Sequence, residues 1–177
     1  MAENTAGPNF TGTTPAGDAA ADPHAAANAA ERMGIGTIVH GDFDEVADRT
    51  RQAIADGGFG VLTEIDVTAT LKKKIDRDIE RILILGACNP PFAAQALDAT
   101  RDISLVMPCN VVVREDLAHG GDAIRVTALN PAAMGEMAGV DGIDDIMAEA
   151  TTMLTAIIDS LKSPLIGDAA SVALRPL

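Results

Sequence analysis

The stretch RILILGACNPPFAAQALDATRDISLVMPCNVVVRED, residues 81–116, holds both cysteines of the chain, each followed by asparagine and lying close to proline. Its first apolar run, ILILGAC (82–88), is typical of an inner strand of a sheet. Asn89 then precedes two prolines, a pattern that predicts a helix capped by Asn89 and continuing through FAAQALDAT. ISLVMP and CNVVVRED predict two strand segments that Pro108 separates.

The segment before this stretch predicts two further strands and two helices. GIGTIVHG (34–41) is rich in β-formers, and a capping box at residues 42–45 predicts a helix that ends at the glycine pair 57–58. FGVLTEIDV (59–67) alternates as a half-buried strand does. Thr68 is expected to cap a short helix that carries three consecutive lysines on a solvated surface.

The segment after it predicts a hairpin and a long helix. Gly120 and Gly121 mark a turn, and AIRVTALN (123–130) alternates as a strand. A loop rich in Met and Gly is expected after Pro131, and Asp141 is expected to cap the last helix. The apolar positions of that helix follow the helical period at Ile143, Ile146, Met147, Ala150, Leu154, Ile157, Ile158 and Leu161.

This order of elements predicts an α+β domain, a two-layer sandwich with helices on one face of a mixed, mostly antiparallel sheet. A small α/β sandwich with parallel strands is the alternative, and the apparent hairpin argues against it. Residues 33–162 are expected to form this single domain. Residues 1–32 are read as a flexible low-complexity extension and residues 163–177 as a C-terminal tail.

The composition limits the possible partners. The 177 residues suit one domain, and 47% of them are hydrophobic. A net charge of -13 repels phosphate backbones and anionic lipid, and aromatic residues, all Phe, make up only 2%, so neither nucleic acid nor a membrane is expected as a partner. With no long apolar run and no secretion signal, we expect a cytoplasmic protein whose cysteines are thiols, ligands or a redox pair.

Cys88 is the first candidate site residue, because it lies between a strand and the start of a helix. Amide groups and the helix dipole at such a place favour negative charge and can lower the pKa of a thiol. The alternative is a small buried apolar residue that ends a strand. Cys109 opens the next strand. Taken alone, Cys109 is better explained as a side chain that only packs than as a site residue.

The repeated Cys-Asn pair is what indicates a joint site. If the sheet brings both pairs to one end, Cys88, Asn89, Cys109 and Asn110 converge as ligand-binding residues, with Glu64 as the best nearby acid. Both asparagines also have structural explanations. Asn89 can cap a helix, and Asn110 can hydrogen-bond a bent strand to its neighbour. The candidates for catalysis are the two thiols and Glu64, and the sequence indicates neither a reaction nor a cofactor.

A metal site is not predicted. Two cysteines 21 positions apart lack the paired short spacings of a zinc site. His40 and His119 could complete a set of ligands, but each falls at a strand end or in a turn, where a surface role is expected. Phosphate-loop, dinucleotide-binding and nucleophile-elbow patterns are absent from the sequence.

Three motifs together resemble a known family. They are GFGVLTE (58–64), ILGACNP (84–90) with Ala96-Leu97, and MPCNVVV (107–113), and in this order they resemble the prokaryotic Domain of Unknown Function 302 family over about residues 34–161. The resemblance implies a two-layer α+β domain similar in topology to TATA-box-binding proteins, often dimeric and without a settled activity. The chain departs from the family pattern in its N-terminal extension and in Pro91.

Two functional hypotheses follow. The first is a small-ligand-binding or thiol redox module that uses the paired Cys-Asn site, and the second is a noncatalytic dimeric scaffold or carrier domain in which the cysteines only pack. A homodimer and a small molecule are the expected partners.

Overall fold

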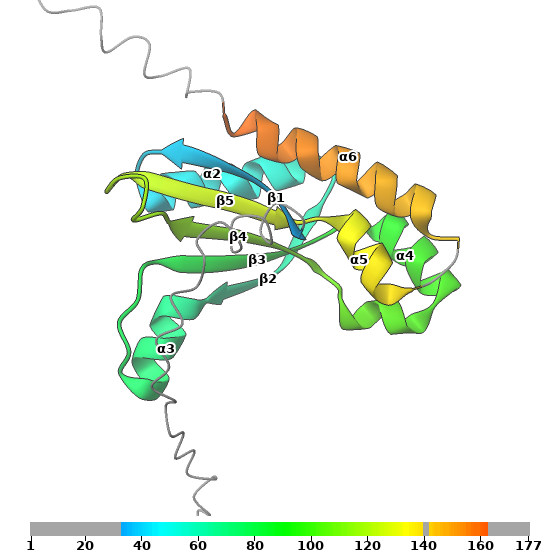
Figure 1. Cartoon of the computed structure of the whole chain (residues 1–177), viewed down its shortest axis with the longest axis horizontal. Helices are drawn as coiled ribbons and strands as arrows, with labels where there is room; N and C mark the ends of the chain where they lie inside the picture. Colours follow the sequence, from blue (N-terminus) through cyan, green and yellow to red (C-terminus); the bar gives the residue numbers. More distant parts are fainter. Residues whose placement is uncertain (1–32, 140–141, 163–177) are drawn as a thin grey trace, which may run out of the picture.

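The computed structural model describes residues 33–139 and 142–162 (Figure 1). Its strands form one sheet in the order β1-β5-β4-β3-β2, and all four neighbouring pairs are antiparallel. The elements are β1 (Gly34–His40), α2 (Phe43–Asp56), β2 (Gly60–Asp66), α3 (Val67–Ile75), β3 (Ile82–Cys88), α4 (Pro90–Ala99), the 3-10 helix η1 (Arg101–Leu105), β4 (Cys109–Glu115), β5 (Ala123–Leu129), α5 (Pro131–Ala138) and α6 (Asp144–Ser160).

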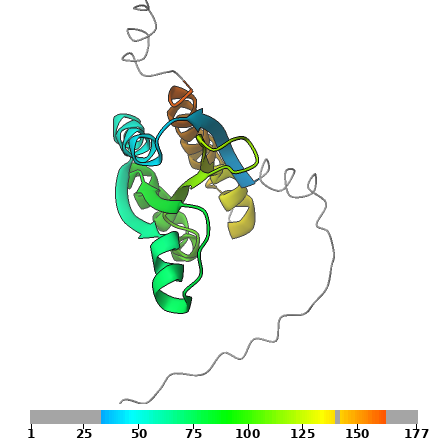
Figure 2. The ribbon, with the colours of Figure 1, turned by 90° about the vertical axis from the view of Figure 1, so that its left-hand side faces the viewer.

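One face of the sheet packs against α2 and α6. Alternate residues of the central strands, such as Val111 and Val113 of β4 and Leu85 of β3, are fully buried in one core with Ile54 of α2 and Leu154 of α6. The intervening residues of the strands are more exposed. The predicted two-layer α+β class is therefore confirmed, and the expected mixed sheet is wholly antiparallel among the described strands (Figures 1 and 2).

The apolar stripe of α6 explains why this helix closes the core. Leu154, Ile157 and Ile158 are almost completely buried, as the helical spacing predicted. At about 25 cal/mol for each Å² of apolar surface removed from water, each such side chain stabilises the fold by roughly 1.5 to 3 kcal/mol. The expected N-cap, Asp141, lies outside the described residues, and Ile143 at the N-cap position provides no side-chain hydrogen bond.

Three local predictions were wrong. ISLVMP is not a strand, because residues 101–105 form the 3-10 helix η1, which the Thr100 hydroxyl caps through the Asp102 N–H. The expected loop after Pro131 is helix α5, capped by Asn130 with proline in its first turn. Asp66, rather than Thr68, caps α3, and the Thr68 hydroxyl instead donates to the Glu80 carbonyl.

Strand β2 is an exposed edge strand rather than a half-buried one. A bulge between Val61 and Thr63 shifts its register against β3. Because one extra residue turns the following side chains to the opposite face, Ile65 does not share the core-facing side of Val61 and is 49% exposed.

A second, smaller core lies beyond the end of the sheet. It gathers Ala96 of α4, Ile103 of η1, and Ile143 and Met147 at the start of α6. Figure 1 shows α4, α5 and the first turns of α6 grouped at this end. Among the described residues, no helix is long and apolar enough to cross a membrane. The extension 1–32 and the tail 163–177 lie outside the described residues.

Candidate functional site

The cavity that contains both cysteines lies where the two cores meet. It is bounded by the end of β3, the start of β4, and helices α4, α5 and α6. Its walls are almost entirely apolar. They are formed by Phe59, Ala87, Cys88, Asn89, Phe92, Ala93, Ala96, Ile103, Met107, Pro108, Cys109, Pro131, Met134, Met147 and Ala150.

The cavity is small. The centre of a water-sized sphere can move through about 50 Å³ of it. A single water needs about 10 to 15 Å³ by this measure, so the space suits a group of a few non-hydrogen atoms. Pockets that bind drug-sized organic ligands are about 300 to 1,000 Å³, which is far larger. Cys88, Phe92 and Ala93 are only partly buried, so this side of the cavity reaches the surface.

Antiparallel pairing explains how residues 21 positions apart meet. Cys109, the first residue of β4, pairs with Ala87, which precedes the last residue of β3, Cys88. The end of one strand therefore lies beside the start of the next. Both cysteines are free thiols. Both cysteines therefore line one cavity, although Cys88 follows Ala87 and so leaves β3 on the opposite face of the sheet from Cys109. The sequence had left open whether the two cysteines would converge.

Both thiols are held in their neutral form. Burial raises the pKa of Cys88, and burial together with the charge of Cys88 raises the pKa of Cys109 to about 11. This is opposite to the lowered pKa expected for Cys88 from its place before a helix, and its cause is desolvation by burial.

A thioether approaches the deeper thiol. The Sγ atom of Cys109 lies 3.6 Å from the Sδ atom of Met134 on α5. Met134 is almost fully buried and also lines the cavity. Cys109 therefore has a second sulfur within contact distance, on an element that the sequence had predicted to be a loop.

Asn89 positions the rim of the cavity. Its Oδ1 accepts a hydrogen bond from the Phe92 N–H and so caps α4, while its Nδ2 donates to the Gly58 carbonyl at 3.0 Å. The side chain thereby ties the start of α4 to the turn before β2. With both ends of the amide engaged, Asn89 holds the wall of the cavity in place rather than offering a free donor.

The structure does not bring Asn110 to the cavity. Successive residues of a strand face opposite sides of a sheet, and Asn110 follows Cys109 directly. Asn110 pairs with Gly86, is exposed, and lies on the face away from α2 and α6. The two Cys-Asn pairs are alike in sequence, but only the first one contributes its amide to this region.

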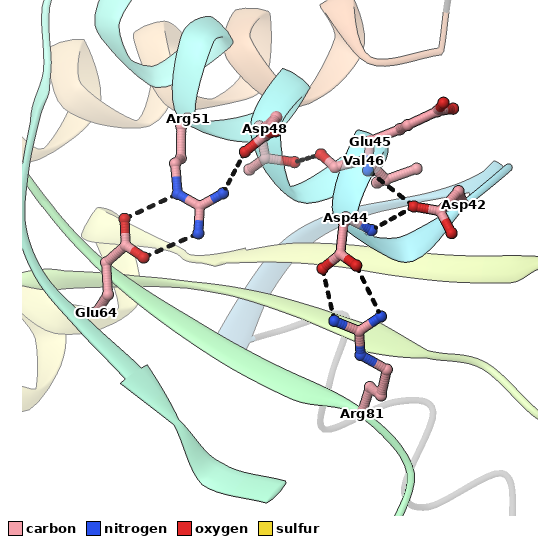
Figure 3. Close-up of polar contacts among 9 residues, drawn as sticks. Asp42, Asp44, Glu45, Val46, Asp48, Arg51, Glu64 and Arg81 are labelled. Atoms are coloured by element: carbon pink, nitrogen blue, oxygen red, sulfur yellow. Dashed lines mark hydrogen bonds and ion pairs between the residues drawn. The ribbon is translucent and has the colours of Figure 1, made fainter. Parts of the chain in front are cut away.

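Glu64 also lies away from the two thiols. Its carboxylate accepts two hydrogen bonds from the Arg51 guanidinium on α2, each 2.8 Å long (Figure 3). These hydrogen bonds hold the pKa of Glu64 below its ordinary value. Arg51 also pairs with Asp48, so Glu64 belongs to an ion-pair network that fastens β2 to α2. It is not placed to exchange a proton with either cysteine.

Figure 3 shows a second, separate ion pair between Arg81 and Asp44, which lies on the same helix α2 as Arg51. The Arg81 guanidinium binds the Asp44 carboxylate at 2.6 Å and stacks 4.0 Å above the ring of Phe43. Hydrogen bonds from Arg81 hold the pKa of Asp44 below its ordinary value. Asp42, as expected, caps α2 through the N–H groups of Asp44 and Glu45. This part of the molecule is a structural joint between helix and sheet.

The two histidines are not metal ligands together with the cysteines. His40 pairs with Asp122 at 3.2 Å, and His119 pairs with Asp116 at 3.1 Å. Both lie near the hairpin between β4 and β5, at the end of β4 opposite to Cys109. Within residues 33–139 and 142–162, no group of three His, Cys, Asp or Glu side chains is arranged to hold a metal ion.

The sequence did not indicate that methionines belong to the site. Met107, Met134 and Met147 line the cavity beside the two cysteines. Met107 belongs to one of the quoted motifs, and Met147 belongs to the apolar stripe of α6, where a core role was a sufficient explanation. Met134 carries no pattern in the sequence, since α5 was taken for a loop. Only the packing of α5 against α6 and β4 brings these thioethers together.

Comparison with known proteins gives a family and a fold. The family model described as a domain of unknown function, DUF302, matches residues 35–161. The crystal structure of an uncharacterized conserved DUF302 protein from Bacillus stearothermophilus superimposes with a TM-score of 0.66 at 24% sequence identity. The superposition covers 73% of this chain and 98% of that one. A comparison with curated proteins found no match.

Proposed function

Because this chain belongs to the DUF302 family, whose domain has no known function, we propose a function from the site itself: the chain is a module that binds a small ligand. The ligand would occupy the cavity between β3, β4, α4, α5 and α6 and contact the thiols of Cys88 and Cys109. The observation that carries this proposal is that two free thiols from separate strands line one small apolar cavity.

The raised thiol pKa values favour binding over thiol redox catalysis. A reactive cysteine depends on its thiolate, and at neutral pH a thiol with a pKa of about 11, such as Cys109, is almost wholly protonated. No described acid or histidine lines the cavity to act as a base. The proposal therefore assigns no catalytic residue, and it places the protein in the reducing cytoplasm, where both thiols stay free.

Methionine methyl groups offer a direct test of ligand entry. Xenon enters dry apolar cavities, so adding xenon to the full chain labelled at its methionine methyl groups should shift the NMR signals of Met134 and Met147. The exposed Met33 and Met137 serve as internal references whose signals should not move. Equal shifts at all methionines, or none at the cavity, would refute the proposed site.

Two variants on one helix sharpen this test. Ala93 lines the cavity, whereas its neighbour Ala94 is exposed and does not. Ala93→Leu should fill the space and abolish the xenon shifts, while Ala94→Leu should leave them as in the original chain. Native mass spectrometry of the same proteins then detects any ligand that copurifies, which should be present with Ala94→Leu and lost with Ala93→Leu.

We propose a homodimeric scaffold as the second candidate, supported by the sheet face that α2 and α6 leave uncovered. Residues that pair directly across adjacent strands lie on the same face of the sheet, so the strand register identifies the side chains of this face. Although the chain has 26 acidic residues, none occupies this face within the paired strand positions. Its members are Gly34, Gly36, Ile38, His40, Gly60, Thr63, Ile65, Ile82, Ile84, Gly86, Cys88, Asn110, Val112, Arg114, Ala123, Arg125, Thr127 and Leu129.

A second copy could pack on this face without bringing carboxylates together. Two sheets stacked face to face lie about 10 Å apart and interdigitate their side chains. Val112 and Ile84 are central in this surface and only partly buried in the single chain. In this role the cysteines would only pack, as the scaffold hypothesis requires.

A further inference from the structure

The cavity concentrates the sulfur of the whole chain. Of its seven methionines and two cysteines, five line this one space. They come from β3, the segment before β4, β4 itself, α5 and α6. These residues are Cys88, Met107, Cys109, Met134 and Met147. Packing alone does not require sulfur at each position, since leucine or isoleucine would fill comparable volume.

From this arrangement we propose that the cavity binds one Cu(I) ion through the sulfur atoms of Cys88, Cys109 and Met134. The inference rests on the proposed binding function and names the class of its ligand, a soft monovalent metal ion. Thiolate and thioether sulfur are the ligands that select Cu(I) in proteins. The small volume of the cavity suits a single ion better than an organic molecule.

The separation of the Cys109 and Met134 sulfur atoms agrees with shared coordination of one ion. Two sulfur ligands, each about 2.3 Å from a metal, lie about 3.8 Å apart at tetrahedral angles and about 4.0 Å apart at the trigonal angles of a three-coordinate ion. The Sγ of Cys109 and the Sδ of Met134 are 3.6 Å apart, so these two need almost no movement to hold one ion, whereas the Cys88 side chain, which lines the same cavity, must turn towards them on binding. A plain thiol–thioether contact would give the same distance, and the experiments below separate the two readings.

The absence of oxygen and nitrogen donors from the lining decides which metal fits. Asn89 has the only polar side chain in the wall besides the thiols, and its two ends are occupied by the Phe92 N–H and the Gly58 carbonyl. Mg²⁺ and Ca²⁺ need oxygen ligands, and structural zinc sites take four ligands from cysteine, histidine and carboxylates. The apolar wall limits water at the site, as a hydrophobic shell around a metal does.

Binding is a ligand exchange without electron transfer. Cu(I) displaces the protons of Cys88 and Cys109, each thiolate donates an electron pair to the ion, and the Met134 thioether donates a third pair without losing a proton. Two protons therefore leave for each ion bound. Copper remains Cu(I) throughout, and the bound complex carries one net negative charge.

The test is an anaerobic titration of the reduced full-length chain with Cu(I) against a colorimetric Cu(I) chelator. One ion per chain should bind, with release of two protons in weakly buffered solution. X-ray absorption of the complex should show sulfur neighbours alone, at about 2.3 Å. Cys88→Ser combined with Cys109→Ser should abolish binding.

Two methionine variants on α5 provide a matched pair. Met134→Leu conserves volume and should weaken Cu(I) binding more than about tenfold, since even residues behind the ligands contribute about 10- to 100-fold. Met137→Leu, an exposed position on the same helix, should bind as the original chain does. Equal affinity of the Met134→Leu and Met137→Leu proteins would overturn the assignment of Met134.

Failure of this inference is distinguishable from failure of the binding function. If Cu(I) does not bind but xenon shifts the Met134 methyl signal, the copper assignment is refuted and the binding module stands. If neither probe acts at the cavity, both are refuted. Binding of Cu(I) that survives loss of both cysteines would place the ion elsewhere and refute the proposed site.

Discussion

At the scale of single residues, Cys109 shows how burial governs the chemistry of a thiol. Its pKa rises from 9.0 to about 11 through burial and the charge of Cys88. We predict that at pH 8 the folded chain holds roughly 100-fold less Cys109 thiolate than the unfolded chain. Alkylation by iodoacetamide, followed by mass spectrometry, should therefore accelerate up to about pH 11 in the folded protein, and a plateau near pH 9 would contradict this.

The same shift predicts a loss of stability in alkali. The unfolded thiol ionises at a lower pH than the folded one, so ionisation favours the unfolded state between about pH 9 and 11. Stability from this thiol is complete below pH 9 and falls as the pH rises through that window, by on the order of 3 kcal/mol. Urea unfolding of the chain and of Cys109→Ala should show a smaller decline for the variant. The absence of Tyr removes phenol ionisation from the comparison.

Asp116 is a carboxylate that the fold keeps charged despite its burial. It is 3% exposed, and Arg125 binds its Oδ2 at 2.7 Å. Burial would raise its pKa, but hydrogen bonds from His119 and Arg125 and the charge of Arg125 bring it below its ordinary value. This contribution to stability is therefore present above about pH 4 and is lost as the pH falls through the lowered folded value.

We predict that Asp116→Asn destabilises the β4–β5 hairpin by about 1 to 3 kcal/mol, because Arg125 loses its charged partner. Urea unfolding at pH 7 measures the difference, and it should shrink as the pH is lowered below 4. A control, Asp122→Asn, removes an exposed partner of His40 and should cost less than about 1 kcal/mol at pH 7. Equal effects of the two substitutions would contradict the role assigned to Asp116.

At the scale of elements, the start of α4 depends on one amide with two tasks. Asn89→Ala removes the cap and the tie to Gly58, and we predict a loss of about 0.5 to 2 kcal/mol. Asn89→Asp keeps the oxygen that accepts from Phe92 but loses the donor to Gly58. Urea unfolding should place Asn89→Asp between the original chain and Asn89→Ala, and an Asn89→Asp protein less stable than Asn89→Ala would contradict this division of roles.

Strand β3 has no room for a side chain at the position of Gly86. A Cβ there would lie 2.3 Å from the Thr63 hydroxyl oxygen and 2.8 Å from the Pro108 ring. We predict that Gly86→Ala destabilises the fold by about 1 to 3 kcal/mol and displaces the segment before Cys109. Methyl NMR should show this as a shift of the Met107 signal. Gly121→Ala, where a Cβ meets nothing within 4 Å, is the matched control and should be nearly neutral.

At the scale of the whole molecule, the uncovered sheet face leads to a prediction about the oligomeric state. We predict that the chain sediments as a dimer and that Val112→Asp, which places a carboxylate at the centre of this face, yields monomers. Leu105→Asp, at an exposed position on η1 away from the face, should remain dimeric. Analytical ultracentrifugation measures the state, and a monomeric original chain or a dimeric Val112→Asp protein would refute the scaffold proposal.

The sequence alone determined most of the elements and one half of the site. Hydrophobic period and capping residues are local properties, so they indicated the strands, α2, α4, α6 and the hairpin, and the repeated Cys-Asn pair raised the hypothesis that Cys88 and Cys109 meet. Local patterns failed where a short segment had no strong period. Residues 101–105 and α5 were therefore misassigned, and the bulge in β2 went unseen.

Only the tertiary structure decided what surrounds the thiols. Strand register set Cys109 beside Ala87 but turned Asn110 to the opposite face, and it directed Glu64 to Arg51 instead of the cavity. Packing of α5 brought Met134 to Cys109, and burial in the folded chain raised the pKa values of both thiols. Facing direction, burial and long-range contact depend on elements far apart in the chain, and a local pattern does not encode them.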